Sequence, residues 1–289
     1  MNLKSKFEAG EFAVLAEMEP PKGVDVSTMV TNAMRVKGEV DAFVVPEMSN
    51  AVMRMSSLGG AMILQSKGME TVIQLNCRDR NRIALQADLL SAFGCGIANV
   101  MTVTGEETSF GDHHQARSVY DIDLLELLRA ITGLQQGKDM AGIDLSGSPN
   151  FLVGSTVDAG AKGKSTELVL EEMNKKIEAG AQFFVSPPLF DLSTIQPFLK
   201  RVDPKKAKII PTVLLLKSLG MARYMVRNVD NVFIPDSLIA RIQKAPDKVR
   251  ECTMIASEMV ATLKKEGFSG VLISTIGWED KIPELLDRI

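Results

Sequence analysis

The amino-acid sequence predicts a (β/α)8 barrel, or TIM barrel, that spans residues 1–289 as one domain. Two observations lead to this prediction: eight short apolar runs recur along the chain, and amphipathic segments lie between them. A third observation is negative, because neither GxGxxG nor a P-loop pattern follows an early apolar run. The competing architecture, an open doubly wound sheet, usually carries such a phosphate-binding loop.

The eight runs read as buried parallel strands because they are short, strongly apolar and bounded by polar or glycine-containing segments. We expect strands at 13–18, 41–46, 71–76, 98–103, 151–155, 183–187, 208–213 and 270–274. Helical periodicity is clearest in four of the intervening segments, 80–93, 121–136, 165–179 and 247–266. No Gly/Ser linker or low-complexity tract interrupts this alternation, which favours a parallel sheet with helical crossovers.

Three segments exceed what a minimal barrel unit needs. Residues 104–120 and 137–150 are long polar connections on either side of the fourth crossover helix, and long connections often carry function. We expect one at the rim of the active site and the other at the opposite face of the barrel. Residues 229–246 read as an additional element inserted before the last long helix.

The first strand, within AVLAEMEPPKG, ends on two carboxylates. Residues two apart on a strand point to the same side, so Glu17 and Glu19 project together and Met18 projects away. Pro20 and Pro21 lack the N–H group that would continue the strand ladder. Both carboxylates therefore lie at the carboxyl-terminal end of the strand, where barrel enzymes have their active sites.

The composition limits the classes of partner. The chain of 289 residues has a net charge of −3, which provides no basic field for nucleic acid or for an anionic membrane. Its cysteines, Cys77, Cys95 and Cys252, are far apart and show neither CxxC nor a metal-like spacing. The first residues have no apolar signal core, and no stretch approaches the length of a membrane span. We therefore expect a cytoplasmic protein with buried thiols.

Carboxylates are prominent among the strand ends that would converge on the barrel mouth. The candidate positions are Glu17, Glu19, Pro46, Glu47, Asn76, Thr104, Gly105, Glu106, 186–188, 214–217 and 275–278. The two histidines, His113 and His114, are neighbours on a loop, which suits neither a catalytic triad nor a metal site. These residues favour acid–base chemistry by carboxylates, serving an organic cofactor, without a metal.

Five motifs in order resemble the methylenetetrahydrofolate reductase family: AEMEPPKG, AVMRMSSL, QLNCRDRNRIALQADLL, VTGEETSFGDHHQARSVYDID and KKIEAGAQFF. The resemblance covers nearly the whole chain and is nearest to the short MetF-type forms of organisms with Wood–Ljungdahl one-carbon metabolism. It implies a flavin-bearing (β/α)8 barrel that reduces 5,10-methylenetetrahydrofolate to 5-methyltetrahydrofolate. The implied cofactor is FAD, with FMN as the alternative, and the implied substrate is a folate.

The resemblance assigns the general acid to Glu17, which stands three residues before the Pro-Pro pair. A carboxylic acid in a partly apolar mouth can keep its proton near neutral pH, because desolvation disfavours the anion. Glu106 stands where the family has an aspartate beside flavin and pterin, and it is the second catalytic candidate. The alternative for Glu17 is a structural carboxylate paired with an arginine or a helix terminus, and Glu19 is expected in an ion pair or at the surface.

The cofactor-binding residues implied by the resemblance are Gln74, Thr104, Gly105, Glu106, Tyr120, Gly154 and Lys176. Lys176 matches a family lysine on the phosphate side of the cofactor, and its alternative is an exposed lysine on a helix. Tyr120 matches a tyrosine near the isoalloxazine. Arg78, Asp79 and Asn81 resemble the short-form RDRN motif, which also reads as a helix cap with an ion pair.

Several positions depart from the family pattern. Pro46-Glu47 stands at a flavin-contacting threonine, and Pro187 stands at a glutamine that grips the pterin. Leu219 stands at a folate-stacking phenylalanine, and Trp278 stands at a substrate-facing arginine. Two readings stay open. The first is a divergent flavin-dependent reductase, fed electrons by a partner subunit in place of NAD(P)H. The second is a non-catalytic or redirected barrel subunit that binds another one-carbon carrier. Both readings are compatible with a homo- or hetero-oligomer.

Overall fold

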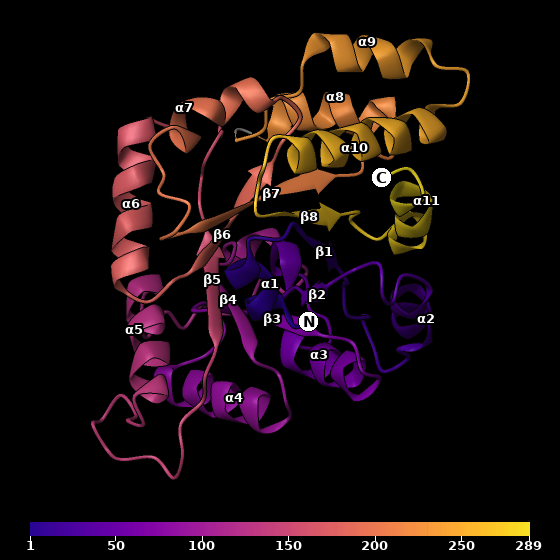
Figure 1. Cartoon of the computed structure of the whole chain (residues 1–289). Helices are drawn as coiled ribbons and strands as arrows, with labels where there is room; N and C mark the ends of the chain where they lie inside the picture. Colours follow the sequence, from indigo (N-terminus) through magenta and orange to yellow (C-terminus); the bar gives the residue numbers. More distant parts are fainter. Residues whose placement is uncertain (230) are drawn as a thin grey trace.

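Eight parallel strands form a closed barrel in the computed structural model, which describes residues 1–229 and 231–289 (Figure 1). Neighbouring strands pair in chain order, and β1 closes the sheet on β8. The strands are β1 (Ala13–Glu17), β2 (Ala42–Val45), β3 (Thr71–Asn76), β4 (Asn99–Val103), β5 (Leu152–Thr156), β6 (Phe183–Pro188), β7 (Lys208–Leu214) and β8 (Gly270–Ser274). The predicted (β/α)8 barrel is confirmed, and each strand lies at an apolar run that predicted it.

Helices cover the outside of the barrel and connect successive strands (Figure 1). The helices are α1 (Leu3–Ala9), α2 (Ser27–Arg35), α3 (Ser57–Ser66), α4 (Arg82–Gly94), α5 (Leu124–Gln135), α6 (Thr166–Glu178), α7 (Gln196–Leu199), α8 (Leu219–Asn228), α9 (Asp236–Lys244), α10 (Lys248–Lys265) and α11 (Ile282–Leu286). Short 3-10 turns are η1 (Ser49–Ala51), η2 (Thr108–Phe110), η3 (Leu192–Thr194) and η4 (Glu279–Lys281). The four segments predicted to be helical correspond to α4, α5, α6 and α10.

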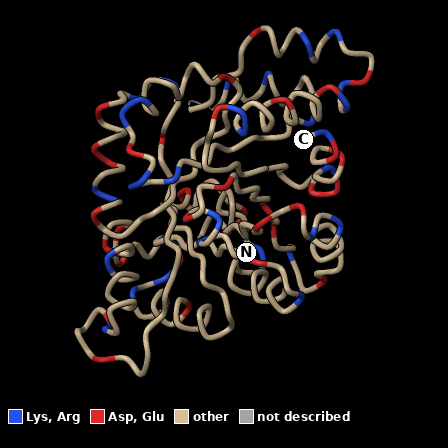
Figure 2. The backbone as a smooth tube through the Cα atoms, viewed as in Figure 1, with Lys and Arg blue, Asp and Glu red and all other residues tan. Residues whose placement is uncertain are grey.

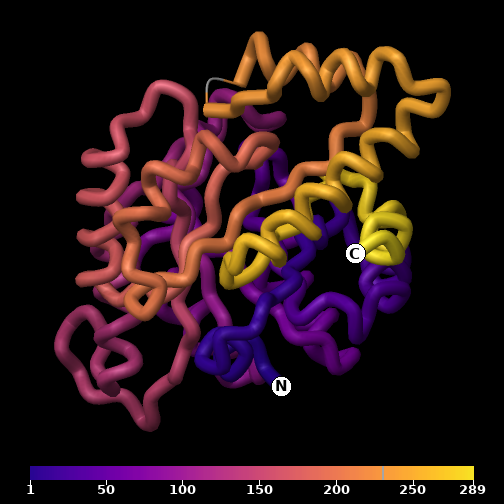
Figure 3. Tube along the Cα trace, turned by 45° about the horizontal axis from the view of Figure 1, so that its top comes forward, coloured from indigo at the N-terminus to yellow at the C-terminus, as the bar shows by residue number. Residues whose placement is uncertain are grey.

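The predicted insertion at 229–246 contains α9, although residue 230 lies outside the described residues. Figures 1 and 3 show α8, α9 and α10 lying side by side on the outside of β7 and β8. Arg241 of α9 pairs with Glu258 of α10, with 2.6 Å between Nη1 and Oε2, and it also contacts Glu251. These ion pairs fix the inserted helix against the long helix.

The barrel interior is an apolar core that α1 closes at the amino-terminal end. Leu3 and Phe7 of this helix are buried, and the ring centroid of Phe7 lies 5.8 Å from that of Phe183. Inward side chains alternate along each strand, so Leu15 lies in this core and Glu17 reaches the cavity at the other end. Helix α1 was not predicted from the sequence.

The two long polar connections lie at opposite ends of the barrel, as predicted. Residues 104–106 line the cavity at the carboxyl-terminal end. The 137–150 connection lies near α1 at the amino-terminal end, where Lys4 Nζ donates to Asn150 Oδ1 at 3.1 Å. The rim position leaves the first connection available for ligand contacts.

Charged residues of both signs are mixed over the outer helices (Figure 2). Within residues 1–229 and 231–289, no helix combines the length and the apolar character needed to cross a membrane. Over the same residues, no group of three or more His, Cys, Asp and Glu side chains is arranged to hold a metal ion.

Candidate functional site

The carboxyl-terminal ends of the strands surround a cavity of about 610 Å³, which we call the mouth cavity. This volume lies within the range of small-molecule sites. Buried apolar side chains, including Met101, Val185 and Leu272, form part of its wall. Its polar lining includes Glu17, Gln74, Thr104, Glu106, Thr156, Asp158 and Thr212. The cavity thus combines an apolar surface with carboxyl, amide and hydroxyl groups.

Glu17 is the last residue of β1, and its side chain lines the mouth cavity. Its pKa is raised to about 7, chiefly by burial and then by the carboxylates of Glu19 and Glu279, while a hydrogen bond with Ser274 acts in the opposite direction. Among the residues that the structure describes, no lysine or arginine forms an ion pair with Glu17, whereas its neighbour Glu19 does form one. A carboxyl with this pKa is partly protonated at neutral pH and can serve as a proton donor.

The alternative prediction for Glu17 was an ion pair with an arginine. In the structure, Arg54 pairs with Glu19 and not with Glu17. Arg54 Nε lies 2.9 Å from Glu19 Oε1, which confirms the ion pair expected for this residue. The pKa of Glu19 is raised, chiefly by burial, and the guanidinium of Arg54 offsets part of this increase. The ion pair therefore holds a carboxylate close to Glu17 without supplying a cation to Glu17 itself.

The turn from Thr104 to Glu106 brings backbone and a carboxylate to the rim. Gly105 has φ +83°, in the left-handed region that glycine adopts most readily, and a Cβ there would lie 3.3 Å from Asn76 Cβ. The Glu106 side chain is 53% exposed, and its Oε2 lies 4.0 Å from Arg78 Nη1. The Glu106 carboxylate is therefore accessible to a ligand and lies close to the guanidinium of Arg78.

The RDRN motif forms a buried ion pair and a helix cap. The Arg78 side chain is 2% exposed, and its Nε and Nη2 each donate to the Asp79 carboxylate at 2.7 Å. Arg78 Nη1 also donates to the Glu106 carbonyl at 2.8 Å. Asn81 Oδ1 accepts from two N–H groups in the first turn of α4, at 3.1 Å each. The capping alternative is confirmed, and the motif ties the end of β3 to the turn after β4.

Two residues predicted to bind a cofactor lie at or near the cavity wall. Gln74 is part of the wall, and Lys176 lies close behind it. Gln74 lines the cavity, and its Oε1 accepts from the Glu47 N–H at 3.4 Å. Lys176 points inward from α6, because its Nζ donates to the carbonyl of Thr156 at 2.7 Å. Burial lowers the pKa of Lys176, which agrees with this inward position and not with an exposed lysine on a helix.

Two other predicted cofactor-binding residues are not among the described residues that line the cavity. Tyr120 has φ +40°, and its N–H donates to the Cys77 carbonyl at 3.1 Å at the end of the 104–120 connection. Gly154 lies in the barrel wall, where an added Cβ would be 2.2 Å from Phe183 Cζ. Packing against this ring accounts for glycine at position 154, and a cofactor contact there stays a prediction.

A family model described as methylenetetrahydrofolate reductase matches residues 2–289. The chain belongs to the methylenetetrahydrofolate reductase family. This confirms the family that the ordered motifs predicted. No protein with a curated description matches the sequence.

Solved structures similar to this member of the methylenetetrahydrofolate reductase family share its fold at low sequence identity. One is an uncharacterized protein from Clostridium thermocellum that binds two copies of 5-methyl-5,6,7,8-tetrahydrofolic acid. It has a TM-score of 0.60 and 13% identity, over 99% of this chain and 97% of that one. A 2,3-dimethylmalate lyase has a TM-score of 0.56 and 10% identity, over 99% and 80%. An EDTA monooxygenase from Chelativorans sp. BNC1 has a TM-score of 0.54 and 11% identity, over 96% and 92%. At these identities the likeness concerns the fold alone.

Glu47, which stands at the flavin-contacting threonine of the reductase family, has a fully buried side chain. Its Oε2 accepts from the Ser57 N–H at 3.0 Å at the start of α3. Its Oε1 lies 2.5 Å from Arg80 Nη2, and Arg80 also pairs with Asp88 of α4 at 3.0 Å. The Glu47 carboxylate therefore joins β2 to two helices.

The sequence places Pro187 at the glutamine that grips pterin in the reductase family, and this assignment stays a prediction. Pro188, and not Pro187, is among the described residues that line the mouth cavity. The reason is a register shift between β6 and β7, which falls between Val185 and Pro188. Neither proline offers a side-chain donor or acceptor, so the loss of this polar group is common to both assignments.

The two remaining departures from the reductase pattern lie near the ends of β7 and β8. Leu219 is the first residue of α8, and its partly buried side chain packs against the outer core. Trp278 is also partly buried, and Lys217 Nζ lies 5.4 Å from its ring centroid. At this distance the ammonium group makes a cation–π interaction.

Asp158 and Thr156 belong to the cavity but were missed from the sequence. Thr156 is the last residue of β5, and Asp158 follows it. Both line the cavity, and Lys176 contacts the carbonyl of Thr156. The candidate mouth positions came from the ends of the other strands and did not include the end of β5. Applying the same rule to the run at 151–155 would have identified both residues.

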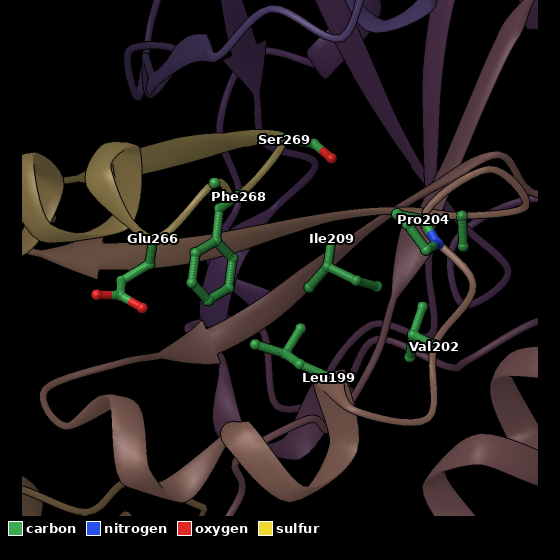
Figure 4. A pocket seen from close by; sticks show the side chains of 9 residues that line it. Leu199, Val202, Pro204, Ile209, Glu266, Phe268 and Ser269 are labelled. Atoms are coloured by element: carbon green, nitrogen blue, oxygen red, sulfur yellow. The ribbon is translucent and has the colours of Figure 1, made fainter.

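Several smaller hollows lie outside the mouth cavity, and they include one beside β7 and one near the rim. One, of about 200 Å³, lies between α7, β7 and the turn into β8, and Figure 4 shows Leu199, Ile209 and Phe268 around it. The other, of about 220 Å³, lies between the connections after β2 and β4, with Met48 and Met53 in its lining. Neither includes Glu17, which lines the mouth cavity.

Proposed function

We propose that this protein reduces 5,10-methylenetetrahydrofolate to 5-methyltetrahydrofolate with a bound flavin, and that Glu17 is the general acid. The observation that carries the proposal is the carboxyl of Glu17, which lines the mouth cavity with a pKa of about 7 in a chain of the reductase family. General acids work best when their pKa lies near the working pH. Near neutrality, Glu17 has a proton to give in a large fraction of molecules.

Glu17 gives its proton to N10 of the folate as the methylene bridge opens. The bond between N10 and the methylene carbon breaks, its electron pair stays on N10, and a cationic iminium remains at N5. The carboxylates of Glu106 and Asp158 line the same cavity and stabilise positive charge there. Apolar walls at Met101 and Leu272 limit water and strengthen these interactions.

The donor set of the mouth cavity fits a flavin. The apolar wall suits a flat ring system, and Gln74, Thr104 and Thr156 offer amide and hydroxyl groups to its polar edge. Lys176 is the cation held on the β5 side, where it would meet a phosphate group. When bound there, a flavin would supply the hydride for the reduction. The residues support FAD and FMN equally, and FAD is proposed on the family resemblance.

A folate as the ligand is supported from two sides. The chain belongs to a family described by its folate reaction, and the similar protein from Clostridium thermocellum binds 5-methyltetrahydrofolate. The cavity volume of about 610 Å³ lies within the range of small-molecule sites. An electron-donating partner subunit is proposed from the resemblance to short forms. Fast turnover of the isolated protein with NADH would contradict the need for such a partner.

The second candidate is a barrel subunit that binds a folate carrier without redox chemistry. It is favoured by Pro188 in the lining, since a proline makes no side-chain hydrogen bond to a pterin. An absorption spectrum separates the candidates, because bound flavin absorbs in the visible range. A colourless protein that takes up neither FAD nor FMN but binds 5-methyltetrahydrofolate would support the second candidate and contradict the first.

Glu17→Gln tests the assigned acid, because it keeps the size and removes the titratable proton. We expect wild-type flavin content and normal reduction by the electron donor, with folate-dependent reoxidation slower by about 10²–10⁴. Asp280→Asn is the matched control. It also removes one carboxylate, but from an exposed residue. Equal reoxidation rates in wild type and Glu17→Gln would end the proposal. Loss of flavin in Glu17→Gln would favour a structural role for this carboxyl.

A further inference from the structure

The connection after β2 has an unusual backbone where it passes the mouth cavity. Met48 has φ +49°, Asn50 has φ +55° and Ala51 has φ +56°, so all three lie in the left-handed region. Asparagine adopts this region fairly often, whereas methionine and alanine adopt it rarely. Such backbone persists where surrounding contacts hold it, and it is often found at functional sites.

The strained segment brings Ser49 to the mouth cavity. Ser49 lines this cavity, whereas Met48 and Ala51 on either side of it line the hollow of about 220 Å³ near the rim. The Ser49 carbonyl accepts from the Val52 N–H at 3.2 Å within the turn. The Ser49 hydroxyl can both donate and accept a hydrogen bond, so the segment offers this group to a ligand in the mouth cavity.

The connection after β4 packs directly against the strained segment. Gly111 is buried, and a Cβ added there would lie 1.9 Å from the carbonyl oxygen of Ala51, so the two backbones are in contact. The Asp112 carboxylate accepts from the Met53 N–H at 3.0 Å. Both contacts hold the backbone that directly follows Ser49.

Asp112 also joins these two connections to the one after β1. Its carboxylate forms an ion pair with Lys22, and its Oδ1 lies 2.8 Å from Nδ1 of His113. In addition, the Met55 N–H donates to the Pro21 carbonyl at 3.0 Å. Three rim connections therefore meet at one carboxylate, and the connection with the strained segment is anchored to both of the others.

We propose that the Ser49 hydroxyl binds the ligand of the mouth cavity, and that Asp112 is the positioning residue that holds Ser49 there. The ligand chemistry rests on the proposed function. Flavin and pterin share a pyrimidine ring with a carbonyl oxygen and ring nitrogens, and a hydroxyl can hydrogen-bond to any of these atoms. Asp112 acts by fixing the backbone on which Ser49 stands.

Binding titrations of Ser49→Ala test the contact without relying on turnover. We expect the affinity for flavin or for 5-methyltetrahydrofolate to fall about threefold to tenfold, because one hydrogen bond is lost. A loss for one ligand assigns the contact to that ring, and a loss for both assigns one hydrogen bond to each. Ser109→Ala is the matched control, because Ser109 is an exposed serine of the connection after β4. Unchanged affinities for both ligands in Ser49→Ala, or an equal loss in Ser109→Ala, would overturn the proposal.

Asp112→Asn tests the positioning role, because it keeps the size of the side chain and removes the charge that pairs with Lys22. We expect weaker binding of the same ligand as in Ser49→Ala, and little further loss when the two substitutions are combined. Residues that act through one contact show such non-additive effects. Asp144→Asn is the matched control, since Asp144 also pairs with a lysine, at 2.7 Å, in the connection at the other end of the barrel. Additive losses in the double variant, or normal affinity in Asp112→Asn, would overturn the positioning role.

The same titrations distinguish a failure of this proposal from a failure of the proposed function. A wild-type protein that binds 5-methyltetrahydrofolate but carries out no reduction would contradict the reductase, and the affinities would still decide the role of Ser49. A wild-type protein that binds neither flavin nor 5-methyltetrahydrofolate would contradict both.

Discussion

A carboxyl whose pKa is raised to near neutrality makes the fold less stable at higher pH. The pKa of Glu17 rises from an ordinary value of 4.5 to about 7, so between these values the folded chain binds more protons than the unfolded chain. Stability therefore decreases as pH rises from 4.5 through 7, and the loss levels off above the folded pKa. The same burial that suits Glu17 to give a proton is thus a local source of instability.

Glu17→Gln should consequently stabilise the protein at alkaline pH. The shift from 4.5 to about 7 corresponds to about 3 kcal/mol at pH 8, and to almost nothing at pH 4. Urea unfolding of wild type and Glu17→Gln at both pH values measures this difference. A variant that is equally destabilised at pH 4 and pH 8 would show that Glu17 stabilises the fold as a hydrogen-bonding group, independently of its proton.

At the scale of elements, β5 and β6 depend on the absence of a side chain at Gly154. The Phe183 ring occupies the space that a Cβ at this position would need, with 2.2 Å between them. Overpacking of a close-packed core usually costs about 1–3 kcal/mol. We therefore expect Gly154→Ala to lower the denaturant midpoint, and Phe183→Leu in the same chain to restore part of it. If Gly154→Ala instead reduced flavin content at unchanged stability, the cofactor-binding role predicted from the resemblance would be favoured.

The elements also show what the sequence could and could not predict. Each strand was predictable because a parallel strand in a barrel is apolar on both faces and reads as a short continuous run. Glu47 was predicted at the mouth and lines the cavity, but its contacts with Ser57 and Arg80 were not predictable, because these two residues come from other elements. The exchange of Pro187 for Pro188 in the cavity depends on a register shift between two strands, which one strand's sequence does not contain.

At the scale of the whole molecule, the two ends of the barrel have different tasks. The acid–base residues predicted from motifs, Glu17 and Glu106, do come together at the carboxyl-terminal end, where the fold alone predicts an active site. The amino-terminal end is closed by α1, which was missed because its seven residues are too few to show a clear helical period. Its contribution is tertiary, since Leu3 and Phe7 bury their side chains in the barrel core.

This division predicts that stability and ligand binding can be changed separately. Phe7→Ala removes a buried ring that packs against Phe183, so we expect a loss of about 3–5 kcal/mol in the free energy of unfolding. The folded fraction should still bind flavin normally, because the mouth cavity lies at the other end of the barrel. Phe110→Ala is the matched control, since Phe110 is 77% exposed and its loss should change stability by less than about 0.5 kcal/mol. Urea unfolding of both variants and flavin titration of Phe7→Ala measure the two effects. Reduced flavin affinity in folded Phe7→Ala would show that the amino-terminal closure shapes the mouth cavity through the shared core.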